Sequence, residues 1–234
     1  MRLEGIAGRV AVVTGSGSGI GATVTETLQK LGARVAGIDL EAGSAGPELA
    51  LAADVRDEAQ VDAAFAEAEA RLGAVEMLVT CAGVFTPVPI ADLELAEWTR
   101  TIDINLTGTF LCAKRALGPM RQAGFGRIVT ISSGAGIDGG TESCAHYAAS
   151  KGGVIALTKA LAKESAADGV LVNVVAPRAV RTPMLAGMTD GMDEAIPVGR
   201  IGEPDDVAAA VAFLCSAHAS YVSGEVLVLN GGWW

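Results

Sequence analysis

Residues 14 to 21 read TGSGSGIG and follow an apolar, β-branched run, RVAVV, at residues 9 to 13. The three glycines at 15, 19 and 21 have the spacing G-x-x-x-G-x-G, and a helix-like segment begins inside the motif. Glycine at a strand-to-helix turn lets the backbone approach a pyrophosphate, which binds the free N–H groups at the positive end of the helix. The motif predicts a dinucleotide site; a tight turn without a ligand is the alternative. The predicted contacts are Gly15, Ser18, Gly19, Ile20 and Gly21.

A second feature of the predicted site is Asp39, which ends the next strand-like run, RVAGID at 34 to 39, about 20 residues beyond the loop. A carboxylate there accepts hydrogen bonds from the adenosine ribose hydroxyls and repels a 2′-phosphate. Its neighbours Ile38 and Leu40 are not basic, so the sequence favours NAD over NADP. A solvated acid at a strand end is the alternative. Asp54 and Val55, which follow a further short strand, are predicted to flank the adenine in the same crevice.

Short β-rich runs alternate with longer helix-like segments along the whole chain. This alternation is typical of a parallel sheet with helices on both faces. No repeat or linker divides the chain, so we expect one α/β domain of 234 residues, with a cofactor-binding half at about 1–125 and a catalytic and substrate-binding half at about 126–234. The seven predicted strands lie at 9–15, 34–39, 49–52, 76–83, 127–133, 170–177 and 225–232.

Composition narrows the possible partners and compartments. The chain carries a formal net charge of −10, with scattered Lys and Arg, which disfavours nucleic acid as a partner. It lacks an apolar stretch of the roughly 20 residues that a membrane span needs, and its start does not resemble a signal peptide. The four cysteines show no C-x-x-C spacing and are expected to be reduced core thiols. These features predict a soluble, cytoplasmic protein that binds neither nucleic acid nor membrane.

Tyr147 and Lys151 are the candidate catalytic pair, because residues i and i+4 share one face of a helix. Tyrosine, with a reference pKa near 10, is a poor acid-base group at neutral pH unless a nearby cation stabilises the phenolate. Upstream, the run RIVTISS ends in Ser132 and Ser133, and only one of two successive strand side chains can face the site. Tyr-x-x-x-Lys also arises by chance on ordinary helix surfaces, so the pair by itself leaves that alternative open.

Five segments in order resemble the motifs of the short-chain dehydrogenase/reductase family, and the similarity covers essentially the whole chain. They are TGSGSGIG at 14–21, IDINLTGTF at 102–110, IVTISS at 128–133, YAASK at 147–151 and NVVAPRAVRTPM at 173–184. The resemblance implies a single-domain Rossmann fold with a seven-stranded parallel sheet and an NAD(P)-dependent interconversion of a secondary alcohol and a ketone.

Within the family, the chain looks most like the 3-oxoacyl-acyl-carrier-protein reductase branch. The competing enzyme hypothesis is a catabolic alcohol, hydroxy-acid or dihydrodiol dehydrogenase. A hypothesis of another class is a nucleotide-binding regulatory protein that has kept the fold without turnover. In either enzyme, the expected partner is a small ketone, alcohol or acyl thioester.

The resemblance also assigns roles to individual residues. Tyr147 resembles the acid-base residue, and Lys151 resembles the residue that lowers the tyrosine pKa and binds the nicotinamide ribose. Ser133 resembles the serine that orients the substrate, and Asn105 the residue that holds a proton-relay water. Further cofactor contacts are implied for Cys81, Ala82, Gly83, Pro177, Val180 and Thr182, together with Tyr147 and Lys151.

Three departures from the family pattern bear on the substrate. Thr80-Cys81 stands where the family usually has Asn-Asn, which removes two side-chain hydrogen bonds. Ser133 precedes Tyr147 by 14 residues, one more than usual, which implies one extra residue in the intervening loop. Arg178 stands where the family has glycine, and it either reaches an anionic substrate group or pairs with an acid. Gly134, Arg178 and Met184 are the predicted substrate residues.

His146 and Cys144 lie beside the tyrosine but do not predict a metal site. They are two residues apart and therefore do not share a helix face, and Ser150 occupies the position where a further ligand would be needed. No metal is expected. Small residues along 148–156 suit close packing of this helix against a neighbour, and in the family such a paired helix forms a dimer interface. We therefore expect a homotetramer, the usual family assembly.

Overall fold

Seven strands form one parallel sheet in the order β3-β2-β1-β4-β5-β6-β7 in a computed structural model, which describes residues 3–41, 46–189 and 191–233. The sequence prediction of a seven-stranded parallel sheet is confirmed. The strands are β1 (Val10–Thr14), β2 (Arg34–Asp39), β3 (Leu49–Ala52), β4 (Val75–Thr80), β5 (Gly126–Ile131), β6 (Val170–Pro177) and β7 (Val226–Leu229).

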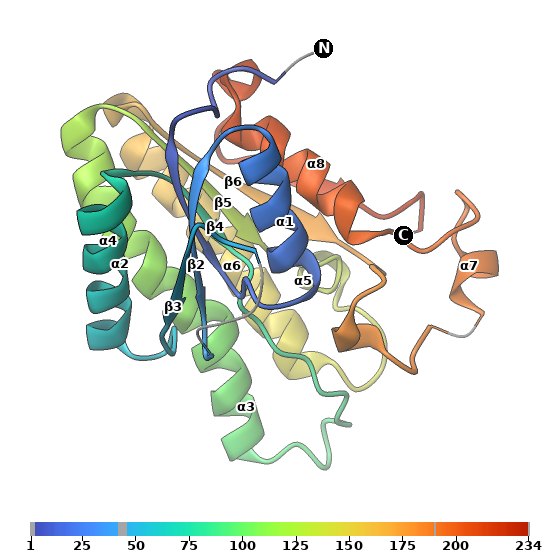
Figure 1. The fold of residues 1–234 in the computed structure, drawn as a ribbon. Coiled ribbons are helices and arrows are strands. Elements are labelled where there is room, and N and C mark those ends of the chain that lie inside the picture. Colours follow the sequence, from blue (N-terminus) through green and yellow to red (C-terminus); the bar gives the residue numbers. More distant parts are fainter. Residues whose placement is uncertain (1–2, 42–45, 190, 234) are drawn as a thin grey trace.

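Helices cover both faces of this sheet (Figure 1). On one face lie α2 (Glu58–Leu72), α4 (Gly108–Ala123) and α6 (Ala145–Ser165); on the other lie α1 (Gly19–Lys30) and α8 (Pro204–Cys215). The shorter helices are α3 (Leu95–Ile102), α5 (Ala135–Asp138) and α7 (Met192–Ala195). A π-helical turn, η1 (Asp103–Thr107), joins α3 to α4, and single 3₁₀ turns lie at η2 (Ala166–Asp168), η3 (Pro183–Leu185) and η4 (Ala217–Ala219).

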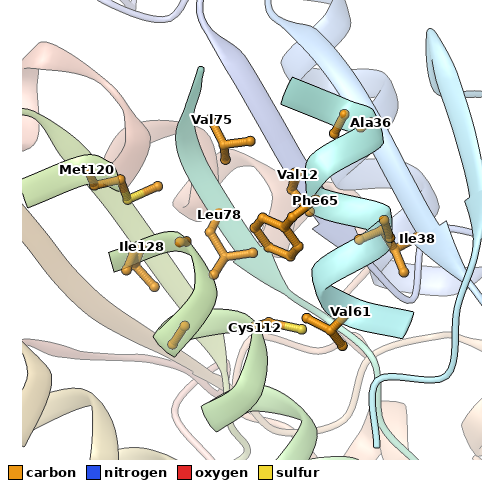
Figure 2. Close-up of a cluster of buried hydrophobic side chains, with 14 of the residues drawn as sticks. Val12, Ala36, Ile38, Val61, Phe65, Val75, Leu78, Cys112, Met120 and Ile128 are labelled. Carbon is orange, nitrogen blue, oxygen red and sulfur yellow. The ribbon is translucent and has the colours of Figure 1, made fainter. Parts of the chain in front are cut away.

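Alternation along β1 divides the core into two layers, because successive strand side chains point to opposite faces. Val10 and Val12 pack in the layer under α2 and α4, whereas Ala11 and Val13 pack in the layer under α1 and α8. Phe65 of α2 is fully buried in the first layer, and Figure 2 shows it beside Val12 and Leu78. Burial of both faces explains why the strands read as nearly continuous apolar runs.

The carboxyl ends of β1 and β4 mark the point where the strand order reverses, which is where open α/β sheets bind ligands. Both strands end together, because Thr14 pairs with Thr80 and β1 offers no further partner. β4 and β5 are therefore shorter than the sequence ranges 76–83 and 127–133 predicted. Cys81–Gly83 and Ser132–Ser133 lie in loops that open at this edge.

The segment that the sequence singled out as a flap, 178–200, contains η3 and α7, and an isolated parallel bridge joins Val180 to Gly202. Asp190 in this segment and the C-terminal Trp234 lie outside the described residues. Across the described ranges, no helix combines the length and the apolar character needed to cross a membrane.

Candidate active site

The glycine loop after β1 has a geometry that only glycine fits at two positions. Gly15 has φ +66°, and a Cβ there would lie 2.7 Å from the backbone nitrogen of Ala82. A Cβ on Gly21 would lie 2.0 Å from the carbonyl oxygen of Gly15. Ser18 is the N-cap of α1, and its side chain makes no capping hydrogen bond within the described structure. The first N–H groups of the helix are therefore available to an anion at the loop.

A crevice of about 260 Å³ opens above this loop. Asp39 lies at its edge with a fixed carboxylate, since Oδ2 accepts from the Gly17 N–H (2.9 Å) and Oδ1 from the Leu40 N–H (2.7 Å). The predicted cofactor residues that line the crevice are Gly15, Ser18, Gly19, Ile20, Gly21, Asp39, Asp54, Val55, Cys81, Ala82, Gly83 and Thr182. A cradle of close-packed glycines, free helix N–H groups and a fixed acid suits the pyrophosphate and ribose of a dinucleotide.

Arg56 also lines the crevice, although no sequence pattern predicted it as a site residue. Its guanidinium pairs with Asp54, with Nε 3.0 Å from both carboxylate oxygens. Hydrogen bonding to Arg56 lowers the pKa of Asp54. Asp54 therefore binds this arginine in addition to flanking the crevice, so the one basic side chain among the described lining residues already has a carboxylate partner.

Next to the crevice lies a second cavity, of about 190 Å³, which we call the catalytic cavity. The two spaces share five lining residues: Ile20, Cys81, Gly83, Thr182 and Met184. Ser133, Tyr147 and Lys151 all line the catalytic cavity, and the Ser133 hydroxyl hydrogen-bonds Tyr147. Of the two adjacent serines, Ser132 instead donates to the carbonyl oxygen of Lys151 at 2.8 Å. The distant segments β5 and α6 thus bring a hydroxyl and a phenol together.

Burial dominates the electrostatics of this cavity. It raises the pKa of Tyr147, which the hydrogen bond from Ser133 only partly offsets, and it lowers the pKa of Lys151 to about 8. The Lys151 ammonium donates to the Ile131 carbonyl (2.9 Å) and lies 5.7 Å from the centroid of the Tyr147 ring. The expected lowering of the tyrosine pKa by Lys151 is thus not seen in the chain by itself, because desolvation of the phenol is the larger effect.

Asn105 braces the site and does not line either space. Its side chain accepts from the Val84 N–H (2.8 Å) and donates to the Val84 carbonyl and to Ser150 Oγ (3.0 Å each). Its own carbonyl oxygen accepts from Thr109 Oγ1 at 2.8 Å. The π-helical turn around Asn105 thus ties the loop after β4 to α6, and both Nδ2 hydrogens of the amide are used in these bonds.

The loop Thr80-Cys81-Ala82-Gly83 is held by Thr14 in place of the missing asparagines. The Cys81 N–H donates to the Thr14 carbonyl (3.2 Å), and the Ala82 N–H donates to Thr14 Oγ1 (3.3 Å). Burial raises the pKa of the Cys81 thiol to about 12, so it stays neutral beside Lys151. The substitution therefore preserves the close approach of the backbone to the crevice.

The three predicted substrate residues take different places. Arg178 and Met184 line the catalytic cavity, as do the predicted cofactor residues Pro177 and Val180. Gly134 does not line it: a Cβ at Gly134 would lie 2.5 Å from Cγ of Arg178, so the arginine side chain covers this glycine. Arg178 forms an ion pair with Asp138, which is one of the two outcomes that the sequence left open.

Several lining residues were not predicted. Phe85 packs a tilted ring against Tyr147 with centroids 4.8 Å apart, and Cys144 and Trp233 also line the catalytic cavity. Phe85 lies two residues after Gly83 of the loop that follows β4, and this position was the one feature of the sequence that could have predicted it as a lining residue. His146 is fully buried, and neither ring nitrogen has a hydrogen-bond partner in the described structure. Among the residues that the structure describes, no group of three or more His, Cys, Asp or Glu side chains forms a candidate metal site.

Comparison with known proteins gives consistent relatives over the whole length. The model of a family described as enoyl-(acyl carrier protein) reductase matches residues 15–234. The chain is 41% identical to cis-4-hydroxycyclohexanecarboxylate dehydrogenase of Sinomonas cyclohexanicum, covering 98% of both chains. It is 37% identical to 3-oxoacyl-acyl-carrier-protein reductase of Salmonella typhimurium, covering 96% of this chain and 97% of the relative. A solved short-chain type dehydrogenase/reductase from Mycobacterium marinum has a TM-score of 0.91 at 31% identity, covering 97% of this chain and 96% of that one.

Proposed function

The chain belongs to the short-chain dehydrogenase/reductase family, and we propose that it is an NAD(H)-dependent oxidoreductase that interconverts a secondary alcohol and a ketone. The observation that carries this proposal is the hydrogen-bonded pair of Ser133 and Tyr147 on the wall of a cavity that adjoins the dinucleotide crevice. A nucleotide-binding regulatory protein without turnover would have no use for this pair.

The two hydroxyl groups divide the work at the substrate oxygen. When bound, the nicotinamide cofactor supplies or accepts the hydride. In the reducing direction, Ser133 donates a hydrogen bond to the carbonyl oxygen, and Tyr147 donates its proton to that oxygen as the alcohol forms. In the oxidising direction, Tyr147 removes the hydroxyl proton. The raised pKa of Tyr147 keeps the phenol protonated and therefore suits the donor role.

Lys151 and Asn105 support this proton transfer. The Lys151 ammonium lies on the tyrosine side of the cavity and stabilises the phenolate that remains after the transfer. We assign Asn105 a positioning role, because its three side-chain hydrogen bonds hold Val84 and the serine before Lys151. A proton-relay water at Asn105 would have to donate to an oxygen, either Oδ1 beside the bond from Val84 or the backbone carbonyl oxygen beside the bond from Thr109.

The preference for NAD rests on the fixed carboxylate of Asp39. Two backbone N–H groups hold it at the ribose end of the crevice, where it would repel a 2′-phosphate. Arg56 is the nearest cation in the crevice, but its pairing with Asp54 opposes a second role as a phosphate ligand. Both features support the use of NAD(H).

Two substrate classes compete. The relative from Sinomonas acts, by its name, on a small hydroxylated ring acid, and a cavity of about 190 Å³ suits a molecule of that size. The relative from Salmonella supports a 3-oxoacyl thioester reductase as the second candidate. A net charge of −10 opposes binding of an acidic carrier protein, so we favour a small alcohol or ketone.

Assembly is a further part of the proposal. The exposed alanines of α6, Ala149 and Ala156, leave room for a second helix to pack closely, and Tyr221 is fully exposed near β7. These surfaces support the homotetramer that the family resemblance implies. Light scattering coupled to gel filtration would give the mass directly, and a monomer of 23.6 kDa would contradict this part.

The test of the proposed function is turnover with both cofactors. Wild-type protein is assayed with NADH and NADPH against small ketones and 3-oxoacyl thioesters, and Tyr147→Phe is assayed beside it. We expect NADH to be preferred and Tyr147→Phe to lower kcat by about 10²- to 10⁴-fold, the range for loss of a general acid. NADH affinity, followed by fluorescence, should change little.

Tyr221→Phe is the matched control, since it removes the same hydroxyl from the chain's other tyrosine, which is fully exposed. It should turn over at the parent rate. Full activity in Tyr147→Phe would contradict the mechanism, and equal rates with NADPH would contradict the role given to Asp39.

A further inference from the structure

We propose that Arg178 selects substrates that carry a carboxylate in addition to the reacting carbonyl, so that the enzyme acts on oxo acids and hydroxy acids. Asp138 is the positioning residue that holds the guanidinium. This inference rests on the proposed function and names the substrate class for the same cavity.

The charge of the catalytic cavity is the first argument. Of the residues that line it in the described structure, Lys151 and Arg178 are basic, and no Asp or Glu is among them. This stands out in a chain with 27 acidic and 17 basic residues. Lys151 already has a role beside Tyr147, and Arg178 has none in proton transfer. A cavity whose charged lining residues are both cations favours an anionic ligand.

The geometry of Arg178 is the second argument. Its side chain starts at the end of β6 and covers Gly134, the residue that follows Ser133. The guanidinium lies over the Trp233 ring, 5.1 Å from its centroid, and Trp233 also lines the cavity. A substrate whose carbonyl oxygen lies on Ser133 and Tyr147 therefore meets the guanidinium only a few bonds away.

The hydrogen-bonding capacity of Arg178 is the third argument. Asp138 pairs with one terminal nitrogen, Nη2, and the described residues provide no acceptor for Nε or Nη1. The Arg178 side chain is 15% exposed, and none of its nitrogens is among the fully buried atoms without a partner, so Nε and Nη1 are accessible to a ligand in the cavity. A carboxylate is the small acceptor that best matches a guanidinium.

Asp138 lies on the solvent side of this pair. Its side chain is 38% exposed and does not line the cavity, and its Oδ1 accepts from the Gly140 N–H at 2.8 Å. The short helix α5 ends at Asp138, and Gly139 follows with φ +90°. Asp138 thus holds Nη2 of Arg178 from outside the cavity, and the other guanidinium nitrogens remain available to a substrate.

The test compares oxo acids with their own carboxamides, in pairs whose ketone and carboxyl carbons are two, three or four bonds apart. Each pair is reduced with NADH by the wild type, Arg178→Met, Arg178→Lys and Arg181→Met. Arg181 is the matched control, because it lies three residues further on, pairs with Glu203 and does not line the cavity.

We expect the wild type to prefer the acid at one spacing, mainly through a lower KM. Arg178→Met should lower the ratio of acid to amide kcat/KM by about 10- to 100-fold, as for the loss of a charge-assisted hydrogen bond. Arg178→Lys should restore part of the ratio, which a purely structural role would not allow. Arg181→Met should leave the ratio unchanged.

Three outcomes would overturn the inference: a wild type that prefers the amides, a ratio that Arg178→Met does not change, or an Arg178→Met defect confined to acetoacetyl-coenzyme A, which would indicate phosphate recognition. If Arg178→Met does not fold, the acid-to-amide kcat/KM ratio of the wild type still tests whether the cavity prefers a carboxylate. Absence of turnover with every ketone and thioester would instead contradict the proposed function itself, so the two failures are distinguishable.

Discussion

The dinucleotide crevice and the catalytic cavity share an edge but are built from different parts of the chain. The part of the crevice that fits a pyrophosphate is backbone: a glycine turn, a helix N-terminus and the loop at Ala82, and of the described acids that line the crevice Asp39 is the one without a basic partner. The catalytic cavity consists of side chains that come from β5, α6, the end of β6 and the C-terminal segment. A site made of backbone constrains a short stretch of sequence, whereas a site made of side chains depends on the whole fold.

The largest effect that tests this contrast is expected from Gly21→Ala. The new Cβ would lie 2.0 Å from the Gly15 carbonyl oxygen, and two backbone segments cannot both move without opening the start of α1. We expect a loss of at least about 3 kcal/mol of unfolding free energy, the upper range for overpacking, and loss of NADH binding. Urea denaturation and a fluorescence titration measure the two effects.

Gly17→Ala is the matched control in the same loop. Its φ is not positive, and its Cβ would meet the Asp39 carboxylate at 2.9 Å, a side chain that can shift at the cost of its hydrogen bond from the Gly17 N–H. The expected cost is about 1 kcal/mol. Equal effects of the two variants would show that the crevice does not depend on the backbone contact between Gly15 and Gly21.

The fold and the crevice were predictable from sequence for the same reason. Strands buried on both faces read as apolar runs, and the turn at Gly15 needs glycine because of its positive φ. Both requirements act over a few residues of chain. The ends of β4 and β5 were predicted too late, because where a strand ends depends on where its neighbours end, β1 for β4 and β4 for β5.

The catalytic cavity was predictable only in part. Tyr147 and Lys151 were recognisable because a helix places residues four apart on one face. The ion pair between Asp138 and Arg178 joins residues that no periodic pattern relates, and Trp233 reaches the cavity from the C-terminal segment. The raised pKa of Tyr147 was also missed, because desolvation depends on everything that packs around the phenol.

Lys151 allows a test of the catalytic cavity, the site that is built from side chains. Its pKa is lowered from 10.5 to about 8, so between these values the unfolded chain binds a proton that the native chain has released. Unfolding free energy therefore rises with pH in this window, and below pH 8 the buried charge destabilises the fold. We expect Lys151→Met to be more stable than the wild type by about 3 kcal/mol at pH 7.

This gap should close between pH 8 and pH 10.5, as measured by urea denaturation of both proteins without cofactor. Lys159→Met is the control, since Lys159 is exposed on the same helix. Its difference from the wild type should stay constant with pH. A constant difference for Lys151→Met as well would mean that Lys151 is not desolvated in the native protein.

The smallest effect is expected from Asp39→Asn, which changes a side chain within the backbone-built crevice. The amide keeps the size of the carboxylate but removes the charge that opposes a 2′-phosphate, so the kcat/KM ratio of NADPH to NADH should rise about tenfold, roughly 1.4 kcal/mol. Asp54→Asn is the comparison variant, because it removes a second carboxylate from the crevice and releases Arg56 from its ion pair. If both variants changed the ratio equally, cofactor choice would depend on the total charge of the crevice. If only Asp39→Asn changed it, one carboxylate held by the Gly17 and Leu40 N–H groups would account for the choice, and even this side chain would act through the backbone that fixes it.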